Sequence, residues 1–288
     1  MRVASLGEFL WDVISGQELL GGAAFNFSVQ LSRLGHDVSF ISAVGDDDRG
    51  RRALQTAARL GLSTQFIGTV KNVPTGTVSV EIDAQGQPSY VLHRPAAYDF
   101  AALPSQPIHP DWIYYGTLQL IEPRMLFLLH QLLRRYPNAR RFYDINLRKD
   151  SYTAPLVMEL LALAYVVKLN EDELRSVQQM AGASYESIES FCRAYASRFQ
   201  WDAVCVTRGE RGCAILSRGE YVEVGGIEVS VADTVGSGDA FAAGFLYGLD
   251  RDWRLAKIGE FANRLGALVA SRAGGVPEWS WSELDNFV

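Results

Sequence analysis

The sequence predicts an α/β fold in which a mostly parallel central sheet is covered by helices on both faces. Short apolar runs rich in β-forming residues alternate with amphipathic runs along most of the 288-residue chain. Alternation at these lengths implies right-handed crossovers between parallel strands. One stretch, from Pro74 to Pro95, instead alternates with a period of two and contains no helical run. This stretch predicts an antiparallel hairpin inserted into the α/β chain.

The elements before and within the hairpin can be assigned in order. Each of the two helical runs ends at a glycine, Gly35 or Gly61, as is typical of a helix C-terminus. The segment "DAQGQP" supplies the hairpin turn. The predicted elements of this half are a strand at 2–9, a helix at 23–35, a strand at 37–45, a helix at 47–61, and hairpin strands at 77–82 and 90–93.

After the hairpin the strand–helix order resumes. Without an internal repeat or a Pro/Ser-rich linker, the chain is expected to form one domain, residues 1–288. Parallel sheets bind ligands outside the carboxyl ends of their strands, so functional residues are expected there. The predicted elements of this half are strands at 111–118, 140–146, 165–170 and 202–209, and helices at 122–136, 154–164 and 171–181.

The charge of the chain argues against a nucleic-acid partner. The formal net charge is −6, and a surface for nucleic acid or an anionic membrane would need the opposite sign. The one basic cluster comprises Arg134, Arg135, Arg140 and Arg141. We interpret it as cations near a helix C-terminus, where the helix dipole favours them.

The sequence also predicts a cytoplasmic protein without a membrane partner. The most apolar run, "PLVMELLALAYVVKL", is interrupted by Glu159 and ends at Lys168, short of the roughly 20 residues of a spanning helix. The first residues lack the unbroken apolar core of a secretion signal. The cysteines, Cys192, Cys205 and Cys213, have no CxxC spacing, which argues against a disulfide framework or a zinc site.

The segment "DTVGSGDAF", from Asp233 to Phe241, predicts an anion pocket. Phe241, Phe245 and Leu249 repeat every four residues, so a helix is expected to begin at about Gly238. The first N–H groups of a helix have no intrahelical partner, and the dipole places partial positive charge there. Because glycine lets a ligand approach this backbone closely, the pocket suits a phosphoryl group.

Asp239, at the start of that helix, would repel a phosphate that was merely bound. Its position is explained if it takes a proton from a hydroxyl that attacks the phosphate. The alternative is that Asp239 only caps the helix, and so short a glycine motif does not decide between the two. The chain lacks GxxxxGK[ST], and "GEFLWD" rather than GxGxxG follows the first strand. These absences argue against a P-loop enzyme and a dinucleotide-dependent dehydrogenase.

A second glycine-rich helix entry, "LLGGAAFN", lies near the N-terminus. Gly21 and Gly22 lead into a helix, and Asn26 lies one turn inside it. Asparagine is a poor residue for a helix interior, so its amide is expected to face a ligand.

With "GGAAFN" and "DTVGSGDAF" at these places, the chain resembles the ribokinase-like (PfkB) family of carbohydrate kinases over essentially its whole length. The resemblance implies a ribokinase-like three-layer α/β/α sandwich with a small β-sheet lid over the sugar site. The lid is then expected at about residues 9–19 and 74–98. An ordinary edge ribbon is the alternative for the hairpin. An unpaired lid edge also leaves open a homodimer formed through the lid.

The resemblance implies an ATP-dependent kinase and a role for each matching position. It implies Asp239 as the catalytic base. The implied anion hole consists of the backbone amides of Gly236, Ser237 and Gly238. The implied substrate contacts are Asp12, Gly21, Gly22, Asn26, Arg94 and Asn146, from "GEFLWD", "GGAAFN", the lid tail and "YDINLR". The implied ATP contacts are Arg148, Asn170, Thr207, Gly209, Gly212 and Asn263.

The resemblance also implies cations. "KLNEDE" matches the family's N-x-x-E element, so Glu173 is expected to organise Mg²⁺ through water, which suits magnesium's reluctance to lose its hydration shell. Some relatives bind a monovalent cation such as K⁺ through carbonyls around the positions of Asp233, Val235 and Gly274. Carbonyl ligands leave no side-chain pattern, so the sequence leaves this site open.

Several of these residues have simpler structural explanations. Asn170 could be an N-cap and Glu173 a first-turn acid that favours the helix dipole. Gly209 and Gly212 could be the glycines of a hairpin turn. Arg148 could lie in a solvated loop. Their joint occurrence at strand ends, in the family's order, favours the functional interpretation.

The identity of the sugar is the least determined part of the prediction. "YVLHRPAAYDF" and "YYGTLQL" look most like the fructokinase and 2-keto-3-deoxygluconate kinase branches, and a ketohexose is the expected substrate. Arg94 would suit a carboxylate, unless it only pairs with Asp99. Phe25 stands where relatives have a small residue beside the sugar, and Ser237 where they have alanine. A deoxy sugar acid, ribose, a nucleoside, or a non-catalytic sugar or nucleotide sensor remain as alternatives.

Overall fold

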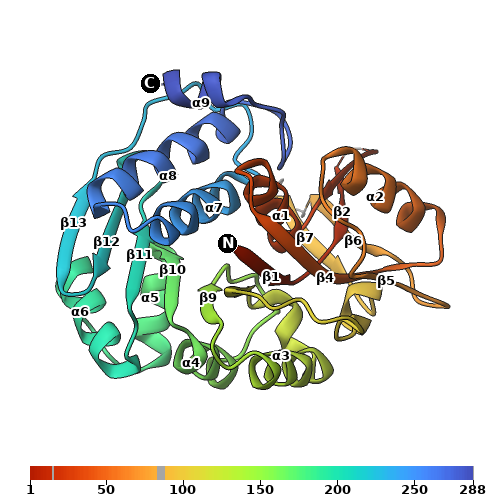
Figure 1. Ribbon diagram of the computed structural model, residues 1–288, viewed down its shortest axis with the longest axis horizontal. Helices are drawn as coiled ribbons and strands as arrows, with labels where there is room; N and C mark the ends of the chain where they lie inside the picture. The colour runs from red at the N-terminus through yellow and green to blue at the C-terminus, as the bar shows by residue number, and fades with distance from the viewer. Residues whose placement is uncertain (15, 83–87, 288) are drawn as a thin grey trace.

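A nine-stranded sheet lies between two helical layers in the computed structural model, which describes residues 1–14, 16–82 and 88–287 (Figure 1). The strand order among these residues is β13-β12-β11-β10-β9-β8-β1-β4-β5. All neighbours from β11 to β5 are parallel, whereas β12 and β13 are antiparallel additions at one edge. The bounds are β1 Arg2–Leu6, β4 Asp37–Gly45, β5 Ile67–Val70, β8 Trp112–Tyr115, β9 Arg140–Asp144, β10 Val166–Asn170, β11 Ala203–Thr207, β12 Cys213–Ser217 and β13 Glu220–Val224.

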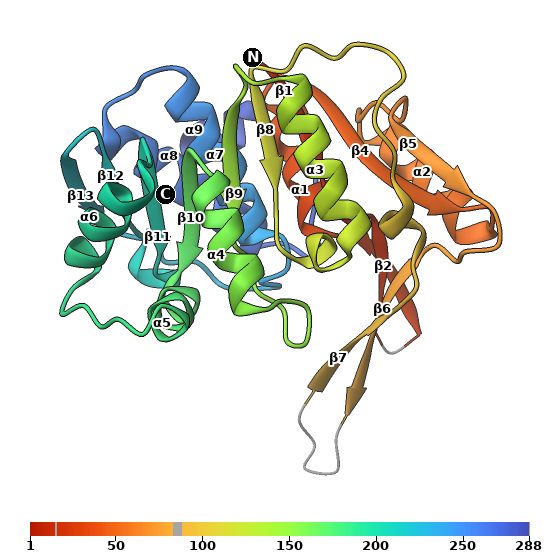
Figure 2. The ribbon, with the colours of Figure 1, turned by 90° about the horizontal axis from the view of Figure 1, so that it is seen from below.

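The helices form two layers, one on each face of the sheet (Figure 2). Helices α1, α2, α7, α8 and α9 share one apolar core with the sheet, and α3, α4, α5 and α6 share the other. Their bounds are α1 Ala23–Arg33, α2 Asp48–Arg59, α3 Pro123–Arg135, α4 Ala154–Leu163, α5 Glu171–Met180, α6 Ile188–Phe199, α7 Ser237–Asp250, α8 Leu255–Ala270 and α9 Trp281–Asn286. Short 3₁₀ turns cover Ala97–Phe100, Leu118–Ile121 and Gly209–Arg211. The predicted three-layer α/β/α class is confirmed.

The strands are apolar on both faces because each feeds two cores. In β4, Phe40 packs with the α1–α7 side and Ile41 with the α3–α4 side, and Phe142 and Tyr143 divide in the same way in β9. Side chains that alternate along a strand point to opposite faces of the sheet. This double burial explains why the strands read in the sequence as short, nearly continuous apolar runs.

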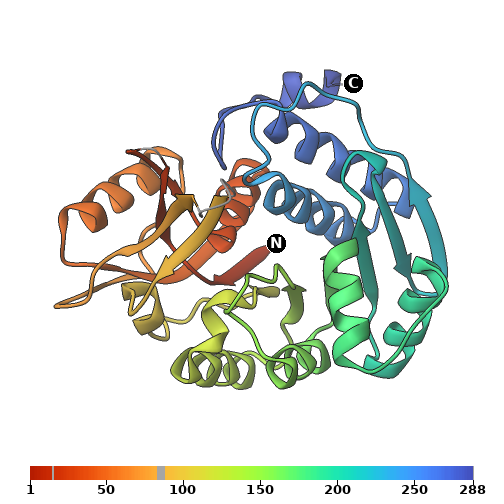
Figure 3. The ribbon, with the colours of Figure 1, turned by 180° about the vertical axis from the view of Figure 1, so that it is seen from behind.

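Helix α7 packs between α1 and α8 (Figures 1 and 3). The α7–α8 contact is close because α7 carries glycines where it meets its neighbour. A Cβ on Gly244 would lie 3.0 Å from the Cα of Ala262, and one on Gly248 would lie 2.9 Å from Cγ1 of Ile258. These two glycines therefore let the α7 and α8 backbones approach each other, and the position of α7 in turn fixes that of Asp239.

A second, four-stranded sheet projects from the large sheet on the side where the carboxyl ends of β8 and β10 lie (Figure 2). Its order among the described residues is β3-β2-β6-β7. The predicted hairpin is confirmed, because β6 and β7 pair antiparallel, while β2 pairs parallel to β6. The predicted turn at 83–87 lies outside the described residues. The bounds are β2 Leu10–Ile14, β3 Gln17–Gly21, β6 Gly76–Ile82 and β7 Pro88–His93.

Two further expectations concern surface properties. Arg134 and Arg135 lie in the last turn of α3, where the helix dipole favours cations as expected. Within the parts of the chain that the structure describes, no helix combines the length and the hydropathy needed to span a membrane.

Candidate active site

The first turns of α1 and α7 meet at the carboxyl edge of the sheet. Asn26, one turn into α1, donates a 2.9 Å hydrogen bond from Nδ2 to Oδ2 of Asp239, the third residue of α7. Both side chains are buried. The contact is possible because Gly275 passes beside Asn26, where a Cβ would lie only 2.9 Å from Nδ2. The structure thus brings together two residues that the sequence assigned to one site.

The backbone before Asp239 has the geometry of an open helix N-terminus. Gly236 has a φ of 76°, and a Cβ on it would overlap the carbonyl oxygen of Gly275. Glycine is therefore required here both for conformation and for space. Among the described residues, no acceptor is found for the backbone N–H groups of Gly236, Gly238 and Asp239. These N–H groups are the donors that an anion would meet.

Ser237 differs from its two glycine neighbours. Its backbone N–H donates to the carbonyl oxygen of Thr234 at 3.3 Å, and its hydroxyl donates to the same oxygen at 2.8 Å. The loop that precedes α7 therefore holds the hydroxyl of Ser237.

A buried ion pair, not predicted from the sequence, lies beside these amides. Nζ of Lys168, in β10, lies 3.0 and 3.2 Å from the two carboxylate oxygens of Asp144, the last residue of β9. Tyr114 donates to the same carboxylate from β8 at 3.4 Å. Burial would lower the pKa of Lys168, but the charges of Asp144, Glu173 and Asp239 raise it above its ordinary value. The ammonium therefore stays charged.

The surroundings of Asp239 are suited to a proton acceptor. Burial raises the pKa of its carboxyl from 3.8 to about 7, and the hydrogen bond from Asn26 opposes that rise. Asp144 raises this pKa further, whereas Lys168 and Arg148 lower it. A pKa near neutrality matches a general base that must both take up and release a proton at physiological pH.

Arg148 and Asn146 follow β9 at the same edge. Arg148 is exposed and, within the described residues, forms no hydrogen bond or ion pair with its side chain. Its charge nevertheless lowers the pKa of both Asp12 and Asp239, so the guanidinium lies within electrostatic range of these two carboxyls. Asn146 has a φ of 41°, so the chain turns sharply between β9 and Arg148. An unpaired guanidinium in this place is available to a phosphate.

The small sheet contributes two of the predicted sugar contacts, Asp12 on β2 and Gly21 on β3. Gly22 follows directly, at the start of α1. Asp12 lies on β2, and a Cβ on Gly21 would lie 2.7 Å from its carboxylate. Burial raises the pKa of Asp12 to about 6, opposed by the charge of Arg148. Gly22 has a φ of 110° and packs against the backbone of Glu8.

Glu8 is a buried residue of this site that we did not predict. Its Oε1 accepts the N–H of Ala23 at 2.7 Å, so it caps α1 from outside the helix. Glu8 lies 15 positions before Ala23 in the sequence, a separation that local capping patterns do not cover. The segment "GEF" after the first strand contains no other pattern that would have predicted a role for Glu8.

Phe25 does not border the sugar, which corrects our interpretation. Its ring is fully buried and packs against Phe9 at a centroid distance of 4.8 Å and against Phe40 at 6.2 Å. Neighbouring residues on a helix point about 100° apart. Asn26 therefore reaches Asp239 while Phe25 enters the core.

Arg94 is held by the protein itself. Its Nη1 donates to Oδ1 of Asp99 at 2.9 Å and its Nη2 donates to the carbonyl oxygen of Leu118 at 2.7 Å. The pairing with Asp99 that we weighed as the simpler explanation is present. The guanidinium is thus largely neutralised before any ligand arrives.

Asn170 and Glu173 form a reciprocal cap at the start of α5. Asn170 Oδ1 accepts the N–H of Glu173 at 2.9 Å, and Glu173 Oε2 accepts the N–H of Asn170 at 2.8 Å. Glu173 Oε1 also accepts the N–H of Leu147 at 2.9 Å. The structural explanation is therefore correct for this pair, and it leaves one lone pair on each carboxylate oxygen for other donors.

Three of the predicted nucleotide contacts lie together at the end of β11. Thr207 is its last residue, and Gly209 and Gly212 have φ values of 60° and 85° in the turn to β12. They are indeed hairpin-turn glycines. Nδ2 of Asn263, on α8, donates to the carbonyl oxygen of Gly225 at 2.9 Å and so ties α8 to the same loops.

The donor set was also tested for a metal ion. Within the described residues, no group of three or more His, Cys, Asp or Glu side chains could hold one. Glu173 lies close enough to Lys168 for its charge to raise the pKa of that lysine, and its oxygens already accept backbone N–H groups. These residues fit a magnesium ion held mainly by phosphate oxygens and water, with Glu173 reached through water.

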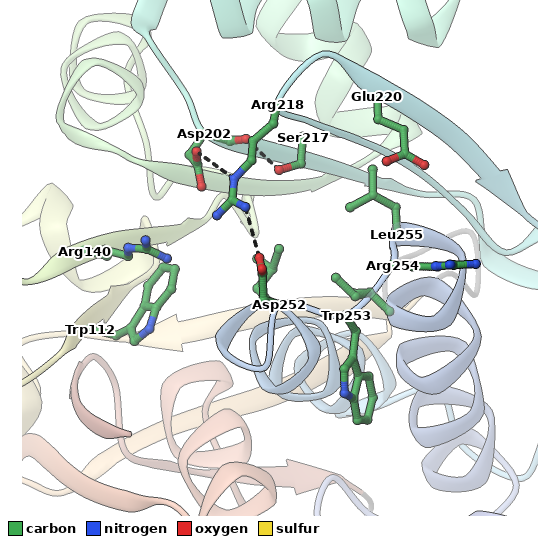
Figure 4. Close-up of a pocket in the computed structure, with 12 residues that line it drawn as sticks. Trp112, Arg140, Asp202, Ser217, Arg218, Glu220, Asp252, Trp253, Arg254 and Leu255 are labelled. Carbon is green, nitrogen blue, oxygen red and sulfur yellow. Dashed lines mark hydrogen bonds and ion pairs between the residues drawn. The ribbon is translucent and has the colours of Figure 1, made fainter.

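A cavity of about 140 Å³ lies at the opposite end of the strands (Figure 4). Trp112 and Arg140, the first residues of β8 and β9, lie on its wall. Arg218 projects into it between Asp202 and Asp252 and pairs with both, at 3.8 and 3.0 Å. None of the predicted site residues lines this cavity, so it is separate from the candidate active site.

Several known proteins are similar to this chain over most of its length. The model of the pfkB family of carbohydrate kinases matches residues 8–281. Fructokinase of Escherichia coli is 29% identical over 96% of this chain and 95% of its own length. Aminoimidazole riboside kinase of Salmonella typhimurium is 28% identical over 89% of this chain and 83% of its own. The structure of fructokinase from Vibrio cholerae O395 with fructose, ADP and calcium superposes with a TM-score of 0.85, covering 99% of this chain and 98% of that one at 26% identity.

Proposed function

The chain belongs to the pfkB family of carbohydrate kinases, and from that premise we propose that it transfers the terminal phosphoryl group of ATP to a hydroxyl of a ketohexose. Asp239 is the general base in this proposal. The open amides of Gly236, Gly238 and Asp239 receive the phosphoryl group, joined by that of Ser237 if its weak bond to Thr234 opens.

One observation carries the assignment. A buried carboxylate with a pKa of about 7 stands at the third position of α7, beside the N–H groups of Gly236, Gly238 and its own residue, which have no acceptor among the described residues. A capping role for Asp239 would use its carboxylate to accept one of these N–H groups, but the carboxylate accepts from Asn26 instead. The arrangement supports proton transfer beside an anion pocket rather than capping.

The reaction requires little covalent work from the protein. Asp239 takes the proton of the attacking hydroxyl, the new bond forms between the hydroxyl oxygen and phosphorus, and ADP leaves with the electrons of the broken bond. The helix dipole and the open amides stabilise the charge on the phosphoryl oxygens. Asn26 keeps the carboxylate aimed into the site.

Other residues of the candidate site are proposed to bind ATP, magnesium and the sugar. Arg148 and the turn of Gly209 and Gly212 are proposed to bind ATP, because both lie at the carboxyl edge of the sheet. Glu173 would hold magnesium through water, and the ion would neutralise part of the charge on the phosphates. Asp12, Gly21 and Gly22 are proposed to bind the sugar below the small sheet, which closes over it as a lid.

The preference for a ketohexose over a sugar acid rests on Arg94. A carboxylate on the substrate would need this guanidinium, but Asp99 and the carbonyl of Leu118 already occupy two of its nitrogens. A neutral polyhydroxy sugar needs donors and acceptors rather than a free cation. The similarity to two fructokinases supports the same choice.

The test is a panel of sugars with ATP and Mg²⁺, followed by release of ADP. Fructose is expected to be the best substrate, above ribose, 2-keto-3-deoxygluconate and aminoimidazole riboside. Asp239→Asn is the matched variant, because it keeps the shape of the side chain while removing the base. It is expected to bind nucleotide and sugar normally and to lose about 10²–10⁴-fold in turnover, as is typical when a general base is removed.

Two outcomes contradict the proposal. If Asp239→Asn turned over sugar at nearly the wild-type rate, Asp239 would not be the general base. An absence of turnover on every sugar, sugar acid and nucleoside, with binding intact, would show a sensor instead of an enzyme.

A further inference from the structure

Lys168 places a charged ammonium inside a strand that is covered on both sides. Its neighbours in β10, Val167 and Leu169, are fully buried in the core, and Lys168 itself is only 7% exposed. Removing a cation from water is costly unless a partner compensates it. The partner is Asp144 on the adjacent strand, with both carboxylate oxygens within 3.2 Å of Nζ.

This pairing does not use the whole ammonium. A lysine has three N–H donors, and the bonds found among the described residues all go to the one carboxylate of Asp144. On another side, the ammonium faces the first turn of α7, where a Cβ on Gly238 would lie 3.5 Å from Nζ. Because Gly238 is a glycine, it places no side chain between Nζ of Lys168 and the first turn of α7.

Stability alone gives a weak reason for such a pair. A buried ion pair usually contributes no more than apolar residues of the same volume would, because both charges lose their water. A cation fixed next to open backbone amides has a clear use if an anion visits them. Both features lie beside Asp239, because Nζ is close to Gly238 and its charge lowers the pKa of Asp239.

We propose that the Lys168 ammonium is part of the anion hole and contacts the phosphoryl group during its transfer, with Asp144 as the residue that positions it. This inference rests on the proposed function. Phosphorus loses its bond to the bridging oxygen of ATP and gains one to the sugar oxygen, and the hydroxyl proton goes to Asp239. Lys168 neither gains nor loses a proton; it stabilises the charge on the phosphoryl oxygens while they are between the two partners.

The test removes the pair without leaving a lone buried charge. The double variant Lys168→Met/Asp144→Asn eliminates both charges and keeps an oxygen to accept from Tyr114. It is expected to melt within a few degrees of the wild type and to bind ADP with about the same Kd. Its kcat should fall about 10²–10³-fold with little change in the KM of the sugar, as when one oxyanion-hole donor is removed.

A second variant and a control make the result specific. Lys168→Gln keeps an N–H donor for Asp144 but carries no charge, and it should lose kcat to a similar extent. Arg218→Met removes one positive charge at the opposite end of the sheet, where Arg218 pairs with Asp202 and Asp252. It should retain wild-type kcat, which would exclude an effect of net charge.

A binding measurement gives a readout besides turnover. The wild type should bind ADP more tightly when aluminium fluoride and the sugar are added, since this mixture mimics the phosphoryl group in flight. Both Lys168 variants should lose most of that gain.

The inference is overturned if a folded Lys168 variant keeps kcat within about threefold of the wild type, or keeps the full gain with aluminium fluoride. The pair would then only join β9 to β10. Failure of the proposed function looks different, because the wild type itself would turn over no sugar.

Discussion

Asn26 and Asp239 are separated by 213 positions in the chain, yet the amide nitrogen of one lies 2.9 Å from a carboxylate oxygen of the other. The bond joins the first turns of α1 and α7, the two glycine-rich helix entries of the sequence. It also opposes the effect of burial on the pKa of Asp239. Asn26, expected to contact the sugar, is therefore also a positioning residue for the base.

The first prediction concerns the pH dependence of turnover. Asp239 must be ionised to accept a proton, and its pKa is about 7. The kcat/KM of the wild type should therefore fall below that pH, by about tenfold per pH unit well into the acid limb. Asn26→Leu removes a hydrogen bond that lowers the pKa, so its acid limb should move to higher pH. The measurement is a kcat/KM profile from pH 5.5 to 9.

Gln30→Leu is the matched control for this experiment. Gln30 is a buried amide one turn further along α1, and it accepts from Nε1 of Trp279 at 2.7 Å rather than contacting Asp239. Its acid limb should stay where the wild type has it. An unmoved limb in Asn26→Leu would show that the bond to Asp239 has no influence on the base.

The predictable parts of the fold are those with local signals. The strand at 37–45 matches β4, and the glycine entry at 236–238 matches the start of α7, because alternation, apolar spacing and glycine act over a few residues. Strands β2, β3, β5, β12 and β13 were not predicted. These strands are short. Strands β3, β5 and β13 are only partly buried, and β12 and β13 each follow a neighbouring strand after a tight turn.

The site was predicted residue by residue but not as a network. Lys168 stood out in the sequence only as the end of an apolar run, although a lysine within a doubly covered strand requires a partner. Finding Asp144 required knowing that β9 and β10 are neighbours. The misplacement of Phe25 has a similar origin, because family position says which helix carries a residue but not which face it occupies.

The second prediction tests the backbone of the anion hole. Gly236→Ala must place a Cβ against the carbonyl of Gly275 at a φ of 76°. The left-handed conformation alone costs about 1–2 kcal/mol for alanine, and the overlap should displace the first turn of α7. A shift of about 1 Å there should lower kcat by roughly 10²-fold.

Gly35→Ala is the control that separates the effect of backbone strain from the effect of displacing the Gly236 amide. Gly35 has a φ of 86°, and a Cβ on it would meet nothing within 4 Å. This variant should lose similar stability in a denaturant titration while keeping kcat. Equal kcat losses in the two variants would mean that the position of the Gly236 amide does not matter.

The third prediction concerns Phe25, which lies in the core with Phe9 and Phe40. Phe25→Ala should reduce the free energy of unfolding by about 3–5 kcal/mol, the usual cost of deleting a buried ring. The KM for the sugar should remain unchanged, because the ring does not border the site. Thermal melting and steady-state kinetics measure the two effects, with Phe127→Ala, 57% exposed, as a neutral control. A large change in KM at wild-type stability would restore Phe25 to the sugar site.

The last prediction concerns the attachment of the small sheet to the body. Glu18, on β3, accepts from Arg49 at 2.7 Å and from Arg52 at 2.5 Å, both on α2. These two hydrogen bonds lower the pKa of Glu18, so the carboxylate is ionised at neutral pH. The ion pairs tie the edge of the proposed lid to a helix that does not belong to it.

Glu18→Gln should loosen this tie with little loss of global stability, about 1 kcal/mol or less, because partly exposed ion pairs contribute little. Lid closure should suffer more than folding, since closure is a smaller free-energy change than unfolding. The KM for the sugar should rise a few-fold, and ATP hydrolysis without sugar phosphorylation should increase as water enters. Asp48→Asn removes a carboxylate that pairs with Arg52 within α2 itself and should change neither quantity. If Glu18→Gln and Asp48→Asn behave alike, the tie between β3 and α2 has no part in closure.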